Sequence, residues 1–143
     1  MNKCFYIIII LLVSCSLSDS QICVENNSPV AKEDVLIENI GVETLGGVFT
    51  PILKVGCKLP CESSQIFSTA EDNQNQIMIV IARGMEKMAK NNVHLGKYKI
   101  QGISPAPRGA PKIKVTFKVV NGSIWLCASH LNGSSQVTLA KLE

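Results

Sequence analysis

The sequence has no long run of one charge and no motif of the common nucleotide-binding or hydrolytic enzymes. Its 143 residues carry 14 basic and 11 acidic side chains, a formal net charge of +3, spread along the chain. Nothing here resembles the basic stripe typical of nucleic-acid binders, so no nucleic-acid partner is expected. The sequence contains no GxxxxGK[ST] loop, no GxSxG elbow and no HExxH pair. We therefore predict that the protein is not an enzyme and needs no cofactor.

Long hydrophobic runs are also scarce, and the one at the N-terminus, FYIIIILLV, is too short to span a membrane comfortably. It follows MNK and precedes SCSLS, which is the order of a secretory signal, so residues 1–20 are predicted to be a signal peptide. The preceding Leu-Val-Ser makes Cys15 a lipobox cysteine and the lipidation candidate. The alternative is ordinary cleavage after Ser16, Ser18 or Ser20. Either route predicts an exported protein, secreted or held at a membrane only by a lipid tether.

Cys4 and Cys15 belong to this signal, which leaves Cys23, Cys57, Cys61 and Cys127 in a compartment where disulfides persist. The CKLPC pair has no histidine close in sequence that would complete a four-ligand zinc site, so no metal is expected. A loop disulfide and free thiols both remain open for these cysteines.

Residues 21–33 are polar and show neither helical nor strand periodicity, which predicts a flexible tether. Short apolar or alternating runs separated by Gly, Pro and Asn follow it. Their number and spacing predict an all-β domain over residues 34–143, an antiparallel β-sandwich of about eight short strands. The runs are LIENIGVETL, GVFTPILKV, QIFSTA, NQIMIVIA, HLGKYKIQGI, PKIKVTFKVV, SIWLCA and SQVTLAKL.

The strongest local pattern is KIKVTFKVVNGSIWLCA, in which apolar residues alternate with polar ones up to an Asn-Gly pair. Asn121-Gly122 tolerates the positive φ of a type I′ turn, so a β-hairpin is predicted. The three prolines of SPAPRGAP, residues 104–111, predict a stiff loop before it. ARGMEKMAKNNVH has helical spacing over barely two turns, which predicts a loop or a frayed turn.

Three segments, IGVETLGGVFT, SQIFSTAEDNQ and LGKYKIQGISPAPRGAPKIKVTF, precede the Asn-Gly hairpin in the order found in one known domain. The sequence resembles the β-sandwich substrate-binding domain of the DnaK-type 70-kilodalton heat-shock chaperones over about positions 34–140. The resemblance includes neither the family's ATPase domain nor its helical lid. It implies binding of extended apolar peptides or unfolded polypeptides in a channel, where polar loops contact the peptide backbone and an apolar pocket takes one side chain.

The resemblance also implies roles for individual positions. The central pocket would be lined by Val42, Phe67, Ile77, Ile79 and Ile113. Backbone or channel contacts would come from Thr44, Ser68, Thr69, Gln74, Gln76 and Met78. Leu45 and Ala70 would form an arch over the peptide, and Asp72 with Arg108 occupy the lid-latch positions, here without a lid. Taken singly, each apolar residue is better explained as part of the core, since alternate residues of a sandwich strand normally face it, and the resemblance supports the set of positions and not each member.

The sequence departs from the family pattern at its start. Asp34-Val35-Leu36-Ile37 resembles the apolar interdomain linker, which in the family docks on the ATPase domain. The stretch after it is several residues shorter than the family pattern, so the first strand is expected to be truncated or frayed. The KVGCK loop and the VNG hairpin tip also depart from the family pattern, which argues against docking to a standard ATPase domain. A separate ATPase-domain chaperone nevertheless stays open as a partner.

Two functions follow. The first is an exported, ATP-independent holder of extended apolar segments of unfolded proteins, a holdase. The alternative is a degenerate or repurposed chaperone domain that serves as a structural or surface interaction protein without peptide binding. Asn26, Asn121 and Asn132 lie in Asn-x-Ser sequons and would be glycan acceptors in a eukaryotic host; for Asn121 the turn alone explains the motif.

Overall fold

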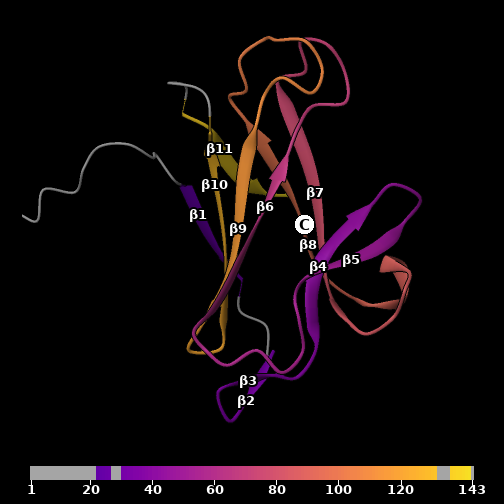
Figure 1. Cartoon of the computed structure of the whole chain (residues 1–143), viewed down its shortest axis with the longest axis vertical. Helices are drawn as coiled ribbons and strands as arrows, with labels where there is room; N and C mark the ends of the chain where they lie inside the picture. Colours follow the sequence, from indigo (N-terminus) through magenta and orange to yellow (C-terminus); the bar gives the residue numbers. More distant parts are fainter. Residues whose placement is uncertain (1–21, 27–29, 132–135, 143) are drawn as a thin grey trace, which may run out of the picture.

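Two antiparallel β-sheets pack face to face in this protein (Figure 1). The computed structural model describes residues 22–26, 30–131 and 136–142. One sheet has four strands, in the spatial order β1 (Ile22–Asn26), β10 (Ser123–His130), β9 (Ile113–Val120) and β6 (Cys61–Phe67). The other has five, in the order β11 (Thr138–Lys141), β8 (Val93–Gln101), β7 (Gln76–Gly84), β4 (Asn39–Thr44) and β5 (Val48–Leu53). The predicted antiparallel β-sandwich is confirmed.

The eight predicted apolar runs correspond to strands β4 to β11. Alternation explains their orientation, because successive side chains of a strand point to opposite faces of the sheet. In β7, for example, Ile77, Ile79 and Ile81 are buried, whereas Gln76 and Met78 are exposed. The inward residues of both sheets form one apolar core, in which Tyr98, Ile100, Ile113 and Phe117 are at most 1% exposed.

The predicted hairpin is present as strands β9 and β10. Val120 pairs with Ser123, and the two residues between them, Asn121 and Gly122, have φ angles of 51° and 79°. Positive φ at both central positions is the requirement of a type I′ turn, whose twist matches that of the flanking strands. The predicted proline-rich loop also holds, because residues 102–112 form no strand. The loop or turn predicted over residues 82–94 holds for its middle, where η1 (Ala89–Asn91) is a single 3₁₀ turn, but its two ends belong to β7 and β8.

Strand β4 is neither truncated nor frayed, in contrast to the expectation from its short approach segment. It pairs with β5 from Ile40 to Thr44 and with β7 from Asn39 to Val42. A register shift between Ile40 and Gly41 accommodates the approach to Pro51 of β5. Pairing on both sides, rather than length, keeps this strand in place.

The expectation of a flexible tether over residues 21–33 is wrong for residues 22–26, which form β1, and also for residues 30–32, where Val30 is 0% exposed in the core and Ala31–Lys32 form β2. This strand pairs with β10 from Ile22↔Ala128 to Asn26↔Ile124. The sequence does contain a weak signal, because Ile22 and Val24 alternate with more polar neighbours and pack against the core. An isolated strand of this length is not stable in water, and it is the pairing with the edge of β10 that stabilises β1.

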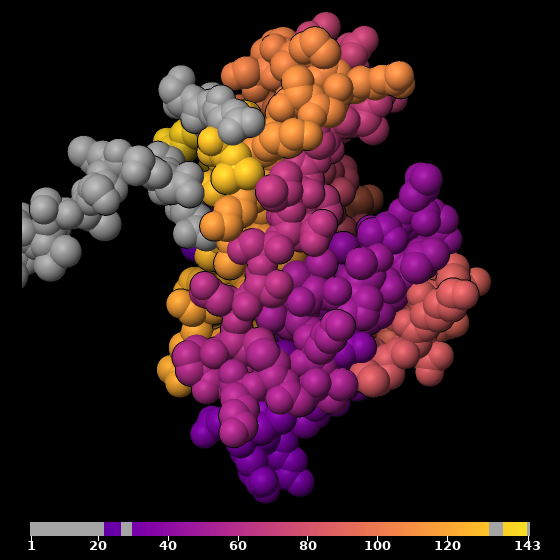
Figure 2. Space-filling model, viewed as in Figure 1, coloured from indigo at the N-terminus to yellow at the C-terminus, as the bar shows by residue number. Residues whose placement is uncertain are grey.

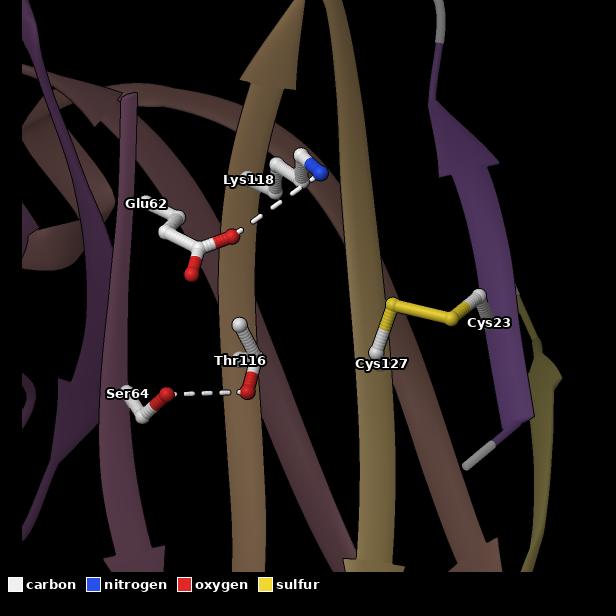
Figure 3. Close-up of a disulfide and its surroundings, with 6 residues drawn as sticks. All are labelled: Cys23, Glu62, Ser64, Thr116, Lys118 and Cys127. Carbon is white, nitrogen blue, oxygen red and sulfur yellow. Dashed lines mark hydrogen bonds and ion pairs between the residues drawn. A yellow bond between two sulfur atoms is a disulfide. The ribbon is translucent and has the colours of Figure 1, made fainter. Parts of the chain in front are cut away.

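Two disulfides cross-link the described part of the chain. A disulfide joins Cys23 on β1 to Cys127 on β10, with 4.0 Å between their Cα atoms, and it lies on the outer face of the four-stranded sheet (Figure 3). A second disulfide joins Cys57 to Cys61, the loop disulfide that the sequence left open. All four cysteines of the described residues are therefore paired.

The segment that resembles the interdomain linker, residues 34–37, is part of the folded domain. β2 (Ala31–Lys32) and β3 (Val35–Leu36) form a two-stranded sheet below the sandwich (Figure 1). Leu36 is 1% exposed and belongs to the main core, whereas Ile37 is 48% exposed. The segment 34–37 therefore offers a partner exposed Ile37 and half-buried Val35, not a free apolar linker.

No helix in the described ranges is long and apolar enough to cross a membrane. The predicted signal peptide, Cys15 and Asn132 lie outside the described residues.

Candidate functional site

The predicted site residues gather at the end of the sandwich where three connections lie. These are the β4–β5 turn at residues 45–47, the β6–β7 loop at residues 68–75 and the β8–β9 loop at residues 102–112. Figure 1 shows the latter two loops together at the top of the molecule, with the tip of the β4–β5 hairpin standing apart from them. In the space-filling view a recess separates this tip from the loops (Figure 2).

Below the loops, the five predicted pocket residues come together in one apolar cluster. Phe67 and Ile113 face each other across strands β6 and β9, and the other three come from the opposite sheet. The members are Val42, Phe67, Ile77, Ile79 and Ile113, of which all but Phe67 are at most 7% exposed. The other four side chains are therefore part of the core, whereas Phe67 is half-buried.

The β6–β7 loop is held by its own side chains. The Gln74 carboxamide oxygen accepts hydrogen bonds from the backbone N–H groups of Ala70 and Glu71, at 2.9 and 3.1 Å. The Gln74 nitrogen donates to the carbonyl oxygen of Gln76 at 2.6 Å. The resemblance gives Gln74 a role in contacting a peptide, but in this structure its polar groups shape the loop that carries Ala70.

The β6–β7 loop is also bonded to the β8–β9 loop at several points. The Gly109 N–H group donates to both the carbonyl oxygen and the hydroxyl oxygen of Thr69, at 3.0 and 3.2 Å. Asn73 donates its N–H to the carbonyl oxygen of Ala106 at 2.8 Å, and the Ser68 hydroxyl donates to the carbonyl oxygen of Pro111 at 2.5 Å. These four hydrogen bonds connect the β6–β7 loop to the β8–β9 loop, so the two loops form one unit.

Asp72 and Arg108, the two lid-latch positions, do meet, but not as an ion pair. An Asp72 carboxylate oxygen accepts a hydrogen bond from the backbone N–H of Arg108 at 2.9 Å. The salt bridges in the described part of the chain are Arg83–Glu38 and Lys118–Glu62, on other surfaces. The Asp72 carboxylate thus positions the proline-rich loop rather than neutralising a guanidinium group.

On the far side of the recess, Thr44 and Leu45 form the end of β4 and the tip of its turn. The Thr44 hydroxyl donates to the carbonyl oxygen of Val48 at 3.1 Å and shares a hydrogen bond with the Thr50 hydroxyl at 3.0 Å. Leu45 is fully exposed, and the predicted second arch residue, Ala70, is also exposed. Two small apolar tips therefore project from separate loops, and Met78 of β7 is 41% exposed.

Sequence reasoning missed His130, which shares a row of the sheet with the pocket candidates. Ile113 pairs with Phe67 on one side and with His130 on the other. The His130 Nδ1 atom is buried and has no hydrogen-bond partner among the described residues. The predicted hairpin could have revealed this neighbour, because a two-residue turn at Asn121-Gly122 places residue 130 opposite residue 113.

The described residues contain no cluster of three or more His, Cys, Asp or Glu side chains that could hold a metal ion. Two sequon asparagines lie within the described ranges, and of these Asn121 is at an exposed hairpin tip. The Asn26 side chain is engaged instead, donating to the Leu95 carbonyl oxygen at 2.7 Å and to the Tyr98 hydroxyl at 3.0 Å.

Comparison with known protein families gives one clear relationship. A family model described as Hsp70 protein matches residues 19–139, which is most of the chain and begins before the start that the motifs alone suggested. The matched region includes the added strand β1 as well as both sheets of the sandwich. This chain therefore belongs to the Hsp70 family, and its described residues form a β-sandwich of the kind by which that family binds substrates.

Proposed function

We propose that the protein binds extended apolar segments of unfolded polypeptides and holds them without a nucleotide cycle. The observation that supports this best is the recess between two rigidly held loops and an exposed apolar hairpin tip, in a domain of a chaperone family (Figure 2). Leu45 and Ala70 would contact the bound chain from its two sides, and Phe67 offers apolar surface below. An extended peptide needs such a combination, because its backbone groups seek polar partners while its side chains seek apolar surface.

Affinity should be modest. The buried state of Val42, Ile77, Ile79 and Ile113 leaves little free apolar surface for a peptide side chain, so the core must adjust before one can enter. A dissociation constant near or above about 1 µM is expected, corresponding to about −8 kcal/mol or weaker. Differences in affinity between related peptides should lie mainly in the dissociation rates.

The test is fluorescence anisotropy of a labelled leucine-centred peptide titrated with the exported protein, with and without ATP. Leu45→Glu should weaken binding at least about tenfold, because a charge would then face the bound apolar chain. Val55→Glu is the matched control, since Val55 is 45% exposed and lies beyond the lower end of β5, next to Asn39. The proposal is supported if the wild type binds the peptide saturably and ATP does not change this binding. Val55→Glu should then bind as the wild type does, and Leu45→Glu should bind more weakly. Binding equal in both variants would contradict it.

A second function is favoured by the same four buried side chains. If the core never opens, the domain is a repurposed chaperone fold that acts as a structural or surface interaction protein without peptide binding. Absence of saturable binding by a folded wild type, with folding checked by circular dichroism, would establish this alternative.

We also propose that the protein works after export, secreted or anchored through lipidated Cys15. The two disulfides of the described residues support an oxidising compartment. Mass spectrometry of the mature N-terminus distinguishes the two routes, since a lipid-modified Cys15 and an unmodified residue following Ser16, Ser18 or Ser20 differ in mass. Retention of residues 1–20 would contradict both.

A partner with an ATPase domain is a further part of this proposal, but the segment 34–37 offers it only Ile37 as an exposed apolar contact. Stimulation of a separate chaperone's ATP hydrolysis by the wild type, lost in Ile37→Asp, would support such a partner. Equal stimulation by both proteins would argue against docking through this segment.

A further inference from the structure

Strand β6 (Cys61–Phe67) is an open sheet edge. It pairs with β9 on one side and ends the four-stranded sheet on the other. On that free side its backbone groups make no backbone hydrogen bond to any residue that the structure describes. Figure 2 shows this strand, in magenta, running up the front surface of the molecule.

The other edge strands of the sandwich, β5, β1 and β11, are either blocked or shorter than β6. β5 contains Pro51, its Phe49 N–H donates to the Lys87 carbonyl oxygen at 2.9 Å, and its Val48 bridges Met88. The remaining edge strands, β1 and β11, have five and four residues against seven in β6, and short edge strands limit pairing with another chain. Proline, charged side chains and covering segments are the usual means by which proteins block an edge. β6, with the sequence CESSQIF, contains no proline and a single charged residue, Glu62, and no described backbone group is hydrogen-bonded to its free side.

The side chains of β6 are self-complementary. In an antiparallel pairing of two copies centred on Ser64, each Ser64 faces the other, and Glu62 of each copy faces Ile66 of the second copy. On the other face Ser63 lies opposite Gln65. No like charges then face each other, because Glu62 is the one charged residue of the strand.

The neighbouring strand adds charge complementarity. Lys114 pairs with Ile66 across β9 and β6 and takes part in no ion pair of the described residues, whereas Lys118 already contacts Glu62 at 3.9 Å (Figure 3). The aliphatic stem of Lys114 can lie over Ile66, which is 54% exposed, and bring its ammonium group to Glu62 of the second copy. A two-fold axis through Ser64 produces this contact twice.

We propose that the β6 edge is an interface between two copies of this chain, which joins their four-stranded sheets into one continuous sheet through antiparallel β6 pairing about Ser64. This inference goes beyond the proposed function and does not depend on peptide binding. The outer faces of Glu62, Ser64 and Ile66 are exposed, so the interface forms without rearrangement of the core.

The first test is sedimentation of the exported wild type from about 1 µM to about 1 mM, together with two substitutions at one exposed position. In Ile66→Glu, the new carboxylate of each copy would lie opposite Glu62 of the other copy. These two repulsions should raise the dimer dissociation constant at least about tenfold. Ile66→Lys would face the same carboxylate with the opposite charge and should keep the dimer at wild-type strength or better. Equal effects of the two substitutions would overturn the proposal.

A cross-link tests the register. Residues that face each other in antiparallel strands have Cα atoms about 4.5–5.5 Å apart, within reach of a disulfide, whereas two Glu62 residues would be offset by about 13 Å. Ser64→Cys should therefore form a covalent dimer under mild oxidation, and Glu62→Cys should not. Cross-linking of Glu62→Cys but not of Ser64→Cys would overturn the inference. So would a wild type that stays monomeric at every concentration tested, even if its β6 edge binds an added peptide.

Discussion

The Asp72 carboxylate and the backbone N–H of Arg108 are joined by a 2.9 Å hydrogen bond that links two loops 36 residues apart in the chain. The identity of the side chain at position 108 is therefore irrelevant to the contact, whereas the side chain at position 72 is essential. The bond adds a carboxylate acceptor to the backbone bonds that already tie these loops, at the border of the recess proposed to bind peptides.

Asp72→Ala should loosen the proline-rich loop, whereas Arg108→Ala should not. Loss of one exposed hydrogen bond to a carboxylate costs about 0.5–1.5 kcal/mol, and exposure places this case at the lower end. Amide hydrogen exchange should show faster exchange at residues 106–109 in Asp72→Ala only. Faster exchange in both variants would show that the Arg108 side chain also holds the loop, and no change in either would show that this bond does not restrain it.

Replacement of both Cys23 and Cys127 by Ser should destabilise the domain more than replacement of both Cys57 and Cys61. The first disulfide closes a sequence separation of 104 residues and the second a separation of 4. In the chain-entropy model a cross-link restricts the unfolded chain more as the loop grows, and losing the long link should cost about 2–5 kcal/mol. Denaturant unfolding measures both. The opposite order would show that the short link matters through the native fold of residues 54–61.

Ile113→Ala should lower the free energy of unfolding by about 2–5 kcal/mol, because Ile113 is fully buried between Phe67 and His130. Ile66→Ala is the matched control one strand away, at a side chain that is 54% exposed. Chemical denaturation of both variants at a single low protein concentration checks the contrast. A small effect of Ile113→Ala would show that the site collapses around the lost atoms.

Gly41→Ala should destabilise the sandwich, because Gly41 lies in β4 where the backbone of β5 comes very close. A Cβ atom at this position would overlap the Thr50 carbonyl oxygen and approach the Pro51 Cα atom to 2.8 Å, and both are backbone atoms that cannot rotate away. Overpacking of this kind costs about 1–3 kcal/mol. Thermal unfolding should show a clear decrease in melting temperature. An unchanged melting temperature would mean that β5 moves freely relative to β4.

Local sequence predicted the strands well where alternation was long or a turn fixed the register. The run Ile113 to Val119 and the Asn121-Gly122 turn define β9, β10 and their pairing without any knowledge of the rest of the molecule. The resemblance to one family, confirmed by the match over residues 19–139, then supplied the candidate site. The five apolar pocket candidates do share one cluster, but their burial could not be read from a sequence in which pocket and core residues look alike.

By itself, the sequence determined the all-β class, the hairpin and the order of strands β4 to β11, because these depend on side-chain alternation and on residues that tolerate positive φ. Only the tertiary structure decided that residues 22–26 join the sheet, that Gln74 bonds within its own loop and that β6 keeps an open edge. Each of these depends on which distant backbone groups lie within hydrogen-bonding distance. Such partners are set by the packing of the whole chain, which no short stretch of sequence specifies.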